Sequence, residues 1–336
     1  MLAPIQELVR WLVRVSTPLL LLEMMQPSFP PAGGGGGIRR KTPLSLILFC
    51  LGHKMSNGST VLSSEEAERF RSFERKRHDS LAITYHDFFT PVTMLAIGPL
   101  LQAVQISPGS MLLDVATGPG SVASEATKVG ARSIGVDLSP NMIALAKKTH
   151  PGIHFRVAEV EHLPFSDQSF DAVVCNFGFG HFLYPEASVA ECVRTLKRGG
   201  RMALSWWDNF SKQRIQGLFR EAIAEIGAEP PPDVPKGYSP VRFSDAGEFA
   251  RLLEGSGLAE VEVKDHQTTY LIPDIDALWH GGLGSFAITA SAIIHQSAAT
   301  QKAIRAALER TAAVYRTPVG LDLPVGFKIA AGRKVI

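Results

Sequence analysis

The stretch Leu112-Leu-Asp-Val-Ala-Thr-Gly-Pro-Gly120 decides how this chain folds. It begins as a short apolar run, continues into a turn with two glycines, and leads into residues 121–129, whose apolar residues have helical spacing. This order predicts a strand, a tight turn and a helix. The glycines let the backbone approach a bound molecule closely, because no Cβ stands in the way. The N–H groups at the start of the helix then face that molecule.

The same alternation of short apolar runs and helices continues along the chain. Residues 140–149 and 185–197 have helical patterns, and Gly199-Gly200 is expected to end the second helix. We expect strands at residues 111–116, 132–137, 153–158, 171–176, 201–206, 258–265 and 323–331. Apolar strands separated by helices are typical of a parallel sheet covered on both faces. The predicted fold class is therefore α/β, with a Rossmann-like, seven-stranded, mostly parallel sheet, helices on both faces and a helical lid.

Acidic residues end the second and third predicted strands, at the edge where such sheets bind ligands. Asp137 can accept hydrogen bonds from a ribose diol, or it can cap the helix at 140–149. Glu159 can accept a hydrogen bond from an adenine amine, and the backbone N–H of Val160 can donate to the ring, or Glu159 is a solvated loop residue. The pattern thus favours an adenosine-containing ligand.

Two ligand classes fit these features. The spacing Gly118-x-Gly120-x-x-Ala123 also matches the dinucleotide fingerprint, so a nicotinamide cofactor stays open. However, Pro119 removes one backbone donor from the loop that would hold a diphosphate. Asp114 adds a negative charge that suits an ammonium or sulfonium group instead.

Four segments in order resemble one known family. They are residues 114–120, Gly135-Val-Asp-Leu-Ser-Pro-Asn-Met142, Ala158-Glu-Val-Glu-His-Leu-Pro-Phe165 and Leu196-Lys-Arg-Gly-Gly-Arg-Met-Ala203. They look like the successive motifs of class I S-adenosylmethionine-dependent methyltransferases, in the branch similar to ubiquinone/menaquinone C-methyltransferases (methyltransferase type 11). The resemblance implies S-adenosyl-L-methionine as the cofactor.

The resemblance also assigns cofactor roles by position. The methionine end would lie against Asp114, Thr117, Gly118 and Gly120, with Tyr85 over it. The ribose and adenine would lie against Asp137, Leu138, Met142, Glu159 and Val160, and the sulfonium and substrate would lie beside Asn176 and Phe177. Two positions depart from the commoner pattern, because Ala116 replaces a glycine and Glu159 replaces an aspartate.

His181 follows the fourth predicted strand and is the candidate catalytic residue. Histidine can take a proton near neutral pH, which is needed only when the methyl acceptor arrives protonated. Alternatively, His181 is a structural histidine that is hydrogen-bonded to its loop. The aromatic residues of the C-terminal third either line an apolar substrate pocket or belong to the core: Trp206, Trp207, Tyr238, Phe243, Trp279 and Phe286.

Composition excludes several classes of protein. The formal net charge is +2 and basic residues form no stripe, so we expect no nucleic-acid partner. Three scattered cysteines predict neither a disulfide framework nor a metal site, and they suit the cytoplasm. The apolar runs before residue 55 are shorter than the ~18–20 residues that span a bilayer, so we expect no stable membrane insertion.

The chain is expected to contain one methyltransferase domain. Residues 1–54, with five consecutive glycines at 33–37, predict a disordered or mis-assigned extension before Met55, with an organelle-targeting peptide as the alternative. The domain at 55–336 divides into a cofactor-binding core at 80–207 and a lid at about 208–257 and 274–318. The oligomeric state is left open.

The predicted reaction is methyl transfer to an O, N or C nucleophile of a small, largely apolar molecule. Two alternatives stay open at this point: a nicotinamide-dependent oxidoreductase, and a cofactor-binding protein that does not methylate. The sequence does not name the acceptor, because lid residues vary without changing the motifs.

Overall fold

The computed structural model describes residues 64–229, 231 and 241–335. These residues lie within the compact unit Val61–Ile336. The predictions for residues 1–54, and the prediction for Tyr238, lie outside the described residues. In the described ranges no single helix has the length and apolar composition to cross a membrane. Two bent pairs of helices have that length and composition only when the two helices of each pair are counted together.

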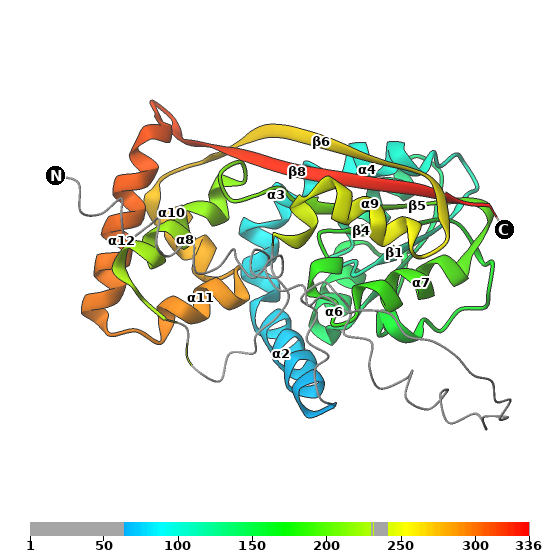
Figure 1. Ribbon diagram of the computed structural model, residues 1–336, viewed down its shortest axis with the longest axis horizontal. Coiled ribbons are helices and arrows are strands. Elements are labelled where there is room, and N and C mark those ends of the chain that lie inside the picture. The colour runs from blue at the N-terminus through cyan, green and yellow to red at the C-terminus, as the bar shows by residue number, and fades with distance from the viewer. Residues whose placement is uncertain (1–63, 230, 232–240, 336) are drawn as a thin grey trace, which may run out of the picture. The chain divides into compact units, whose positions relative to one another are not determined.

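One sheet organises the structure, in the strand order β3–β2–β1–β4–β5–β8–β6 (Figure 1). The first five strands pair in parallel, and β8 lies antiparallel between β5 and β6. The short strand β7 pairs with β8 off this path. The strands are β1 Met111–Val115, β2 Arg132–Asp137, β3 His154–Val157, β4 Phe170–Asn176, β5 Leu196–Trp207, β6 Leu258–Ile272, β7 Arg316–Thr317 and β8 Gly320–Lys334. The Rossmann-like, mostly parallel sheet is thereby confirmed, with β7 as an addition to the seven predicted strands.

Helices cover both faces of the sheet. Crossovers between parallel strands are right-handed. The connection β1–α5–β2 and the connection β4–α7–β5 run in opposite directions across the sheet, so α5 and α7 lie on opposite faces. The α4 helix packs beside α5, and α9 packs beside α7. The helices are α2 Ser64–Phe88, α3 Thr90–Met94, α4 Ile97–Val104, α5 Ser121–Lys128, α6 Pro140–Thr149, α7 Pro185–Thr195, α8 Arg214–Ile226, α9 Ala246–Glu254, α10 Ile275–Leu283, α11 Ala287–Ile294 and α12 Ala298–Ala312, with 3-10 turns η1 Val160–His162, η2 Phe179–His181, η3 Arg242–Ser244 and η4 Ala313–Tyr315.

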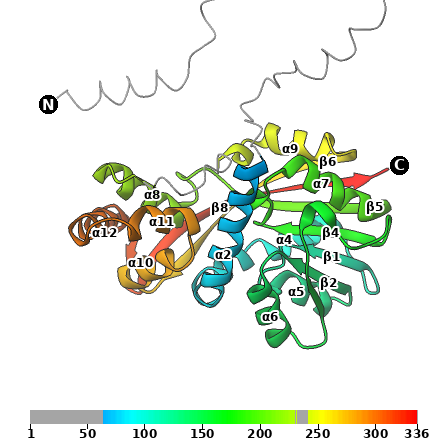
Figure 2. The same cartoon turned by 90° about the horizontal axis from the view of Figure 1, so that it is seen from below.

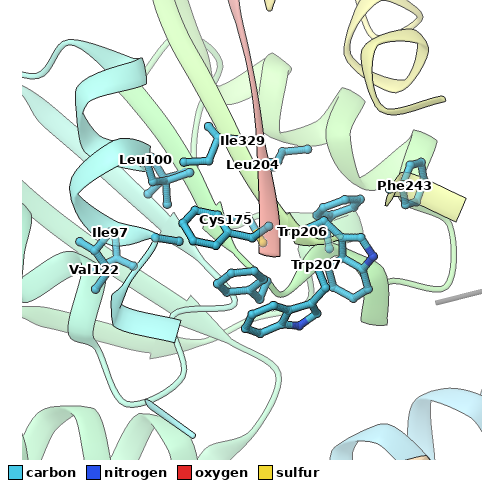
Figure 3. Close-up of a cluster of buried hydrophobic side chains, with 14 of the residues drawn as sticks. Ile97, Leu100, Val122, Cys175, Leu204, Trp206, Trp207, Phe243 and Ile329 are labelled. Carbon is cyan, nitrogen blue, oxygen red and sulfur yellow. The ribbon is translucent and has the colours of Figure 1, made fainter. Parts of the chain in front are cut away.

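The core forms where these helices meet the central strands. Figure 3 shows Leu100 of α4 near Cys175, Leu204 and Ile329 of β4, β5 and β8. Leu100, Cys175 and Leu204 are fully buried. Burial on both faces explains the continuous apolar runs at residues 172–175, 202–204 and 329–331 of these strands.

A long two-stranded ribbon leaves the sheet and supports a separate group of helices. β5 pairs with residues 327–333 of β8, whereas residues 322–326 of β8 pair with β6 alone and Leu321 pairs with both β6 and β7. The ribbon therefore extends past the sheet to α8, α10, α11 and α12, which we call the lid helices (Figures 1 and 2). Within this group α8 packs most extensively against α12.

Several element boundaries differ from the sequence predictions. β6 and β8 are longer than the predicted strands 258–265 and 323–331, because the two strands continue to pair with each other beyond the sheet. The helix predicted at 185–197 ends at Thr195. Gly199 lies within β5 with a φ of 78°, so it does not end the helix as predicted. α9 falls inside the predicted lid range 208–257 but packs on β6 and β8.

Close packing at Gly282 joins the lid helices to one another, which gives a stability test. A Cβ added at Gly282 would lie 2.2 Å from the ring of Phe219, which is fully buried. Gly282→Ala should therefore destabilise the fold by about 1–3 kcal/mol, because overpacking forces side chains and backbone to shift. Urea unfolding monitored by circular dichroism measures this cost.

The matched control is the same change in a Phe219→Leu background. Leucine removes the ring atoms nearest Gly282, so the added cost of Gly282→Ala should shrink there and reveal a coupling between the two positions. Equal costs in both backgrounds would contradict the packing described here.

Candidate functional site

A pocket of about 730 Å³ opens at the carboxyl ends of the parallel strands. Its walls come from the loops after β1, β2, β3, β4 and β5, from α2 and from the lid helices. This volume lies in the range of ligand pockets in proteins. The strand ends that the sequence singled out therefore meet around one cavity.

The loop between β1 and α5 is held by the buried carboxylate of Asp114. Its Oδ2 accepts hydrogen bonds from the hydroxyl of Thr117 at 2.5 Å and from the backbone N–H of Ala123 at 3.1 Å. Asp114 is 1% exposed and does not line the pocket. Its charge therefore fixes the loop from below, instead of facing the ligand.

Burial also changes the acidity of this carboxyl. Removal from water raises the pKa of Asp114 to about 7, and the nearby Asp137 contributes in the same direction, whereas the bonds from Thr117 and Ala123 oppose the rise. The loop anchor thus changes its protonation near neutral pH.

The two loop glycines have different surroundings. A Cβ added at Gly118 would meet no atom within 4 Å, so its backbone faces open space in the pocket. A Cβ at Gly120 would lie 2.7 Å from the ring of Phe155, and its φ of 88° favours glycine. Gly118 therefore permits ligand approach, and Gly120 permits the turn itself.

Asp137 presents an oriented carboxylate to the pocket. Its Oδ2 accepts from the backbone N–H of Gly118 and its Oδ1 from that of Ser139, both at 2.9 Å. The helix α6 is capped by Ser139, whose hydroxyl accepts from the N–H of Met142 at 3.1 Å. Asp137 is therefore not the cap of α6, and its carboxylate is positioned for another partner.

The end of β4 forms an aromatic wall. Phe177 stacks on Trp207 with ring centroids 3.6 Å apart, and Ser205 fixes this corner by accepting from the N–H of Phe177 at 3.0 Å. The Ser205 hydroxyl donates to Asn176 Oδ1 at 2.6 Å, and Asn176 Nδ2 donates to the carbonyl of Thr93 at 3.0 Å. Asn176 thus ties β4 to β5 and α3 while it lines the pocket.

His181 also lines the pocket, and it is paired with a carboxylate from a distant helix. Its Nδ1 lies 3.1 Å from Oε2 of Glu74 on α2, whose side chain is almost completely buried. The same helix contributes Tyr85 to the pocket, and burial raises the pKa of the Tyr85 phenol. α2 therefore forms one complete side of the cavity.

Most of the residues predicted to hold the cofactor share this pocket. Three do not line it: Asp114, Thr117 and Gly120, which build the loop instead. The residues that line it are Tyr85, Ala116, Gly118, Asp137, Leu138, Met142, Glu159, Val160, Asn176 and Phe177.

Comparisons with known proteins identify the chain. Residues 113–204 match the family model described as a methyltransferase domain. The chain is 35% identical over 234 residues to a demethylmenaquinone methyltransferase of Chlorobaculum parvum, with 62% of this chain and 93% of the relative covered. The chain belongs to the class I S-adenosylmethionine-dependent methyltransferases.

Two further proteins are similar to this chain. The demethylmenaquinone methyltransferase of Chlorobaculum tepidum is 35% identical over 234 residues, with the same coverage of 62% and 93%. The solved structure of an N-methyltransferase of Haemonchus contortus is 18% identical, with a TM-score of 0.49 and coverage of 79% of this chain and 60% of that one.

The methyltransferase uses S-adenosylmethionine, and the pocket fits this molecule. The space beside the backbone of Gly118 suits the methionine part, and the oriented carboxylate of Asp137 suits the ribose. These are the positions that the resemblance to the family implies. The nicotinamide oxidoreductase alternative is therefore wrong, although the glycine spacing alone allowed it.

The methyltransferase keeps two left-handed non-glycine residues in its pocket wall. Ala116 has a φ of 53° and Phe177 a φ of 57°, a conformation that costs an L-residue roughly 1–2 kcal/mol. This geometry explains why glycine is commoner at the position of Ala116. Gly178 accommodates the change, because a Cβ there would lie 2.4 Å from Cβ of Ala116.

Sequence reasoning missed part of the site. Glu74 gave no signal, because it lies in a charged helical stretch 107 residues from His181. Of the C-terminal aromatics, Trp206, Trp207 and Phe286 line the pocket, whereas Phe243 and Trp279 are core residues outside it. Helical spacing of Gln216 and Arg220, four residues apart on α8, was the one available sign that both face the pocket.

The raised pKa of Asp114 predicts how stability depends on pH. The folded chain holds this proton more tightly than the unfolded chain, whose Asp pKa is about 3.9. The resulting stabilisation is complete below about pH 4 and is lost as the pH rises through about 7. Asp114→Asn should therefore flatten the fall in the free energy of unfolding between those pH values, measured by urea unfolding.

Asp171→Asn is the matched control, because Asp171 also accepts a hydrogen bond from a backbone N–H, that of Met111 at 2.8 Å. Burial raises the pKa of Asp171, but its bonds to Lys197 and Met111 outweigh burial and lower that pKa. A steep profile that survives in Asp114→Asn would contradict the assignment.

Proposed function

We propose that this methyltransferase methylates an O, N or C nucleophile of a small, largely apolar molecule. The observation that carries this proposal is the aromatic wall beside Asn176. Trp207, Phe286 and Phe89 all line the pocket, and the ring of Phe89 contacts the rings of the other two. Such a wall favours an apolar or aromatic acceptor over a polar polymer. The relatives' own acceptor, demethylmenaquinone by their name, is consistent with that class.

We propose cofactor roles for the pocket residues as follows. The Asp137 carboxylate accepts from the ribose hydroxyls, since its two backbone bonds leave it aimed at the cavity. Leu138 and Met142 pack on the adenine, and Glu159 and Val160 lie at its edge, as their shared position on the pocket supports. S-Adenosylmethionine supplies an electrophilic methyl group when it is bound. The protein then contributes mainly positioning and exclusion of water.

We further propose that His181 takes the proton of the acceptor. The bond to Glu74 favours the tautomer with hydrogen on Nδ1, which leaves the lone pair on Nε2. The buried Glu74 carboxylate also stabilises the imidazolium that forms after proton uptake. Glu74 is therefore a positioning residue for His181.

The cofactor roles predict the effect of Asp137→Ala. Loss of two charge-assisted hydrogen bonds should weaken S-adenosylhomocysteine binding by about a hundredfold or more, measured by isothermal titration calorimetry. Asp171→Ala is the control, since its carboxylate binds Met111 and Lys197 and does not line the pocket. Unchanged affinity in Asp137→Ala would remove Asp137 from the site.

The proposed proton transfer predicts the effects of His181→Gln and Glu74→Gln. With an O- or N-acceptor, His181→Gln should lower kcat by about a hundredfold with little change in KM, because general bases contribute at least that much. It should also flatten the dependence of kcat on pH. Glu74→Gln should lower kcat less and displace that pH dependence without abolishing it. A His181→Gln enzyme with an unchanged pH profile would show that the histidine is structural.

An acceptor screen tests the substrate class itself. The chain is incubated with methyl-labelled S-adenosylmethionine and, in parallel, with small aromatic phenols and amines, with RNA and with a protein extract. The proposal expects label in organic-soluble small molecules. Label confined to RNA or protein would overturn it.

The compartment and partners belong to the same proposal. We place the enzyme in the cytoplasm and acting without nucleic acid, with no membrane-inserted segment. Support comes from two buried free cysteines among the described residues, Cys175 and Cys192, which suit a reducing environment, and from the aromatic rings that line part of the pocket.

A further inference from the structure

The lid helices bring an arginine to the pocket, and among the described residues no carboxylate pairs with it. Arg220 lines the cavity from α8, and its Nε atom is buried without a hydrogen-bond partner among the described residues. Burial lowers the pKa of its guanidinium, and no carboxylate acts against that effect. An arginine in this environment is costly unless a partner arrives.

The other arginine of α8, Arg214, shows how an arginine is satisfied by a carboxylate in this protein. Arg214 forms two parallel bonds to the carboxylate of Glu221, at 2.6 and 2.7 Å, and a third to the hydroxyl of Tyr315 at 2.9 Å. In the part of the chain that the structure describes, no ion pair joins Arg220 to a carboxylate, and this holds for the acids that line the pocket. Glu74 binds His181, and Asp137 accepts from two backbone N–H groups.

The guanidinium is nevertheless held in place. Arg220 stacks over the ring of Phe210, with its Cζ 4.3 Å from the ring centroid, and Phe210 lines the pocket as well. Stacking fixes the plane of the guanidinium and leaves its N–H groups pointing outward within that plane. The geometry is that of a preorganised fork for a planar anion.

A second unsatisfied polar group lies in the same part of the pocket. Ser285 is 8% exposed, its hydroxyl has no hydrogen-bond partner in the described ranges, and it lines the pocket where α10 ends and the chain turns to α11. A hydroxyl can donate to the same anion that a guanidinium binds. Two separate elements of the lid thus line one pocket with donors, and Phe210 and Phe286 line it as well.

We propose that the methyl acceptor carries a carboxylate, which Arg220 binds, with Ser285 as a second donor. This inference rests on the proposed apolar acceptor and narrows it to an amphipathic molecule, in which an apolar or aromatic body lies on Phe286 and Trp207. A carboxylate is favoured over a phenol because it is fully ionised at neutral pH and matches the fork with two oxygens. Arg220 is then a specificity-determining residue.

The test compares two probes that differ only in charge, 2-naphthoate and 2-naphthamide. Their binding to the full chain saturated with S-adenosylhomocysteine is measured by calorimetry for the wild type, Arg220→Gln and Arg220→Lys. The control is Arg310→Gln, which removes the same charge from α12, where Arg310 pairs with Glu225 and lies outside the pocket.

The proposal expects wild type to prefer 2-naphthoate, and Arg220→Gln to bind it roughly tenfold to a hundredfold more weakly. Arg220→Lys should retain part of the affinity, and Arg310→Gln all of it. Binding of 2-naphthamide and of S-adenosylhomocysteine should stay within about twofold in every variant, which also shows that the variants are folded.

Each other outcome has a defined meaning. Equal binding of the two probes, or full 2-naphthoate affinity in Arg220→Gln, overturns the carboxylate proposal and leaves the apolar acceptor standing. A parallel loss of S-adenosylhomocysteine affinity would place Arg220 on the cofactor's own carboxylate and also overturn it. If neither probe binds the wild type, the apolar acceptor fails and the inference fails with it.

Discussion

The buried contact between Asp114, Thr117 and the N–H of Ala123 is the constraint on which the site depends. It joins the end of β1 to the start of α5 and so fixes the loop between them. Gly118 then points its backbone at the pocket and donates to Asp137 on β2. Two neighbouring strand ends are thereby locked into one ligand-facing surface. The buried carboxylate of Asp114 stabilises this arrangement only if its hydrogen bonds offset the free-energy cost of removing its charge from water.

The pocket has two sides with different physical origins. The side formed by β1, β2 and β3 is rigid, because parallel strands and their crossover helices position each loop. The side formed by the lid helices rests on the β6–β8 ribbon. The part of β8 before Phe327 does not pair with β5, and its partners there are β6 and, at Gly320 and Leu321, β7. On the proposed function, changes in the lid would alter acceptor recognition without disturbing the cofactor side. Arg220 and Ser285 lie on this second side.

The first side could be predicted from the sequence, and the second largely could not. Short apolar strands and two glycines located the loop at 114–120, and an acid after each of the next two strands located Asp137 and Glu159. The burial of Asp114 below the loop could not be predicted, since sequence spacing does not tell whether a carboxylate points into the pocket or away from it. Glu74 and Arg220 were out of reach for another reason. Their function depends on which helices pack together over long sequence separations, and periodicity carries no such information.

Hydrogen–deuterium exchange of the full chain, with and without S-adenosylhomocysteine, tests most directly whether this cavity is the cofactor site. The account predicts slower exchange at residues 114–120, 137–142, 159–162 and 176–181, with no comparable change when NADH is added. Protection elsewhere in the chain, or equal protection by NADH, would contradict it.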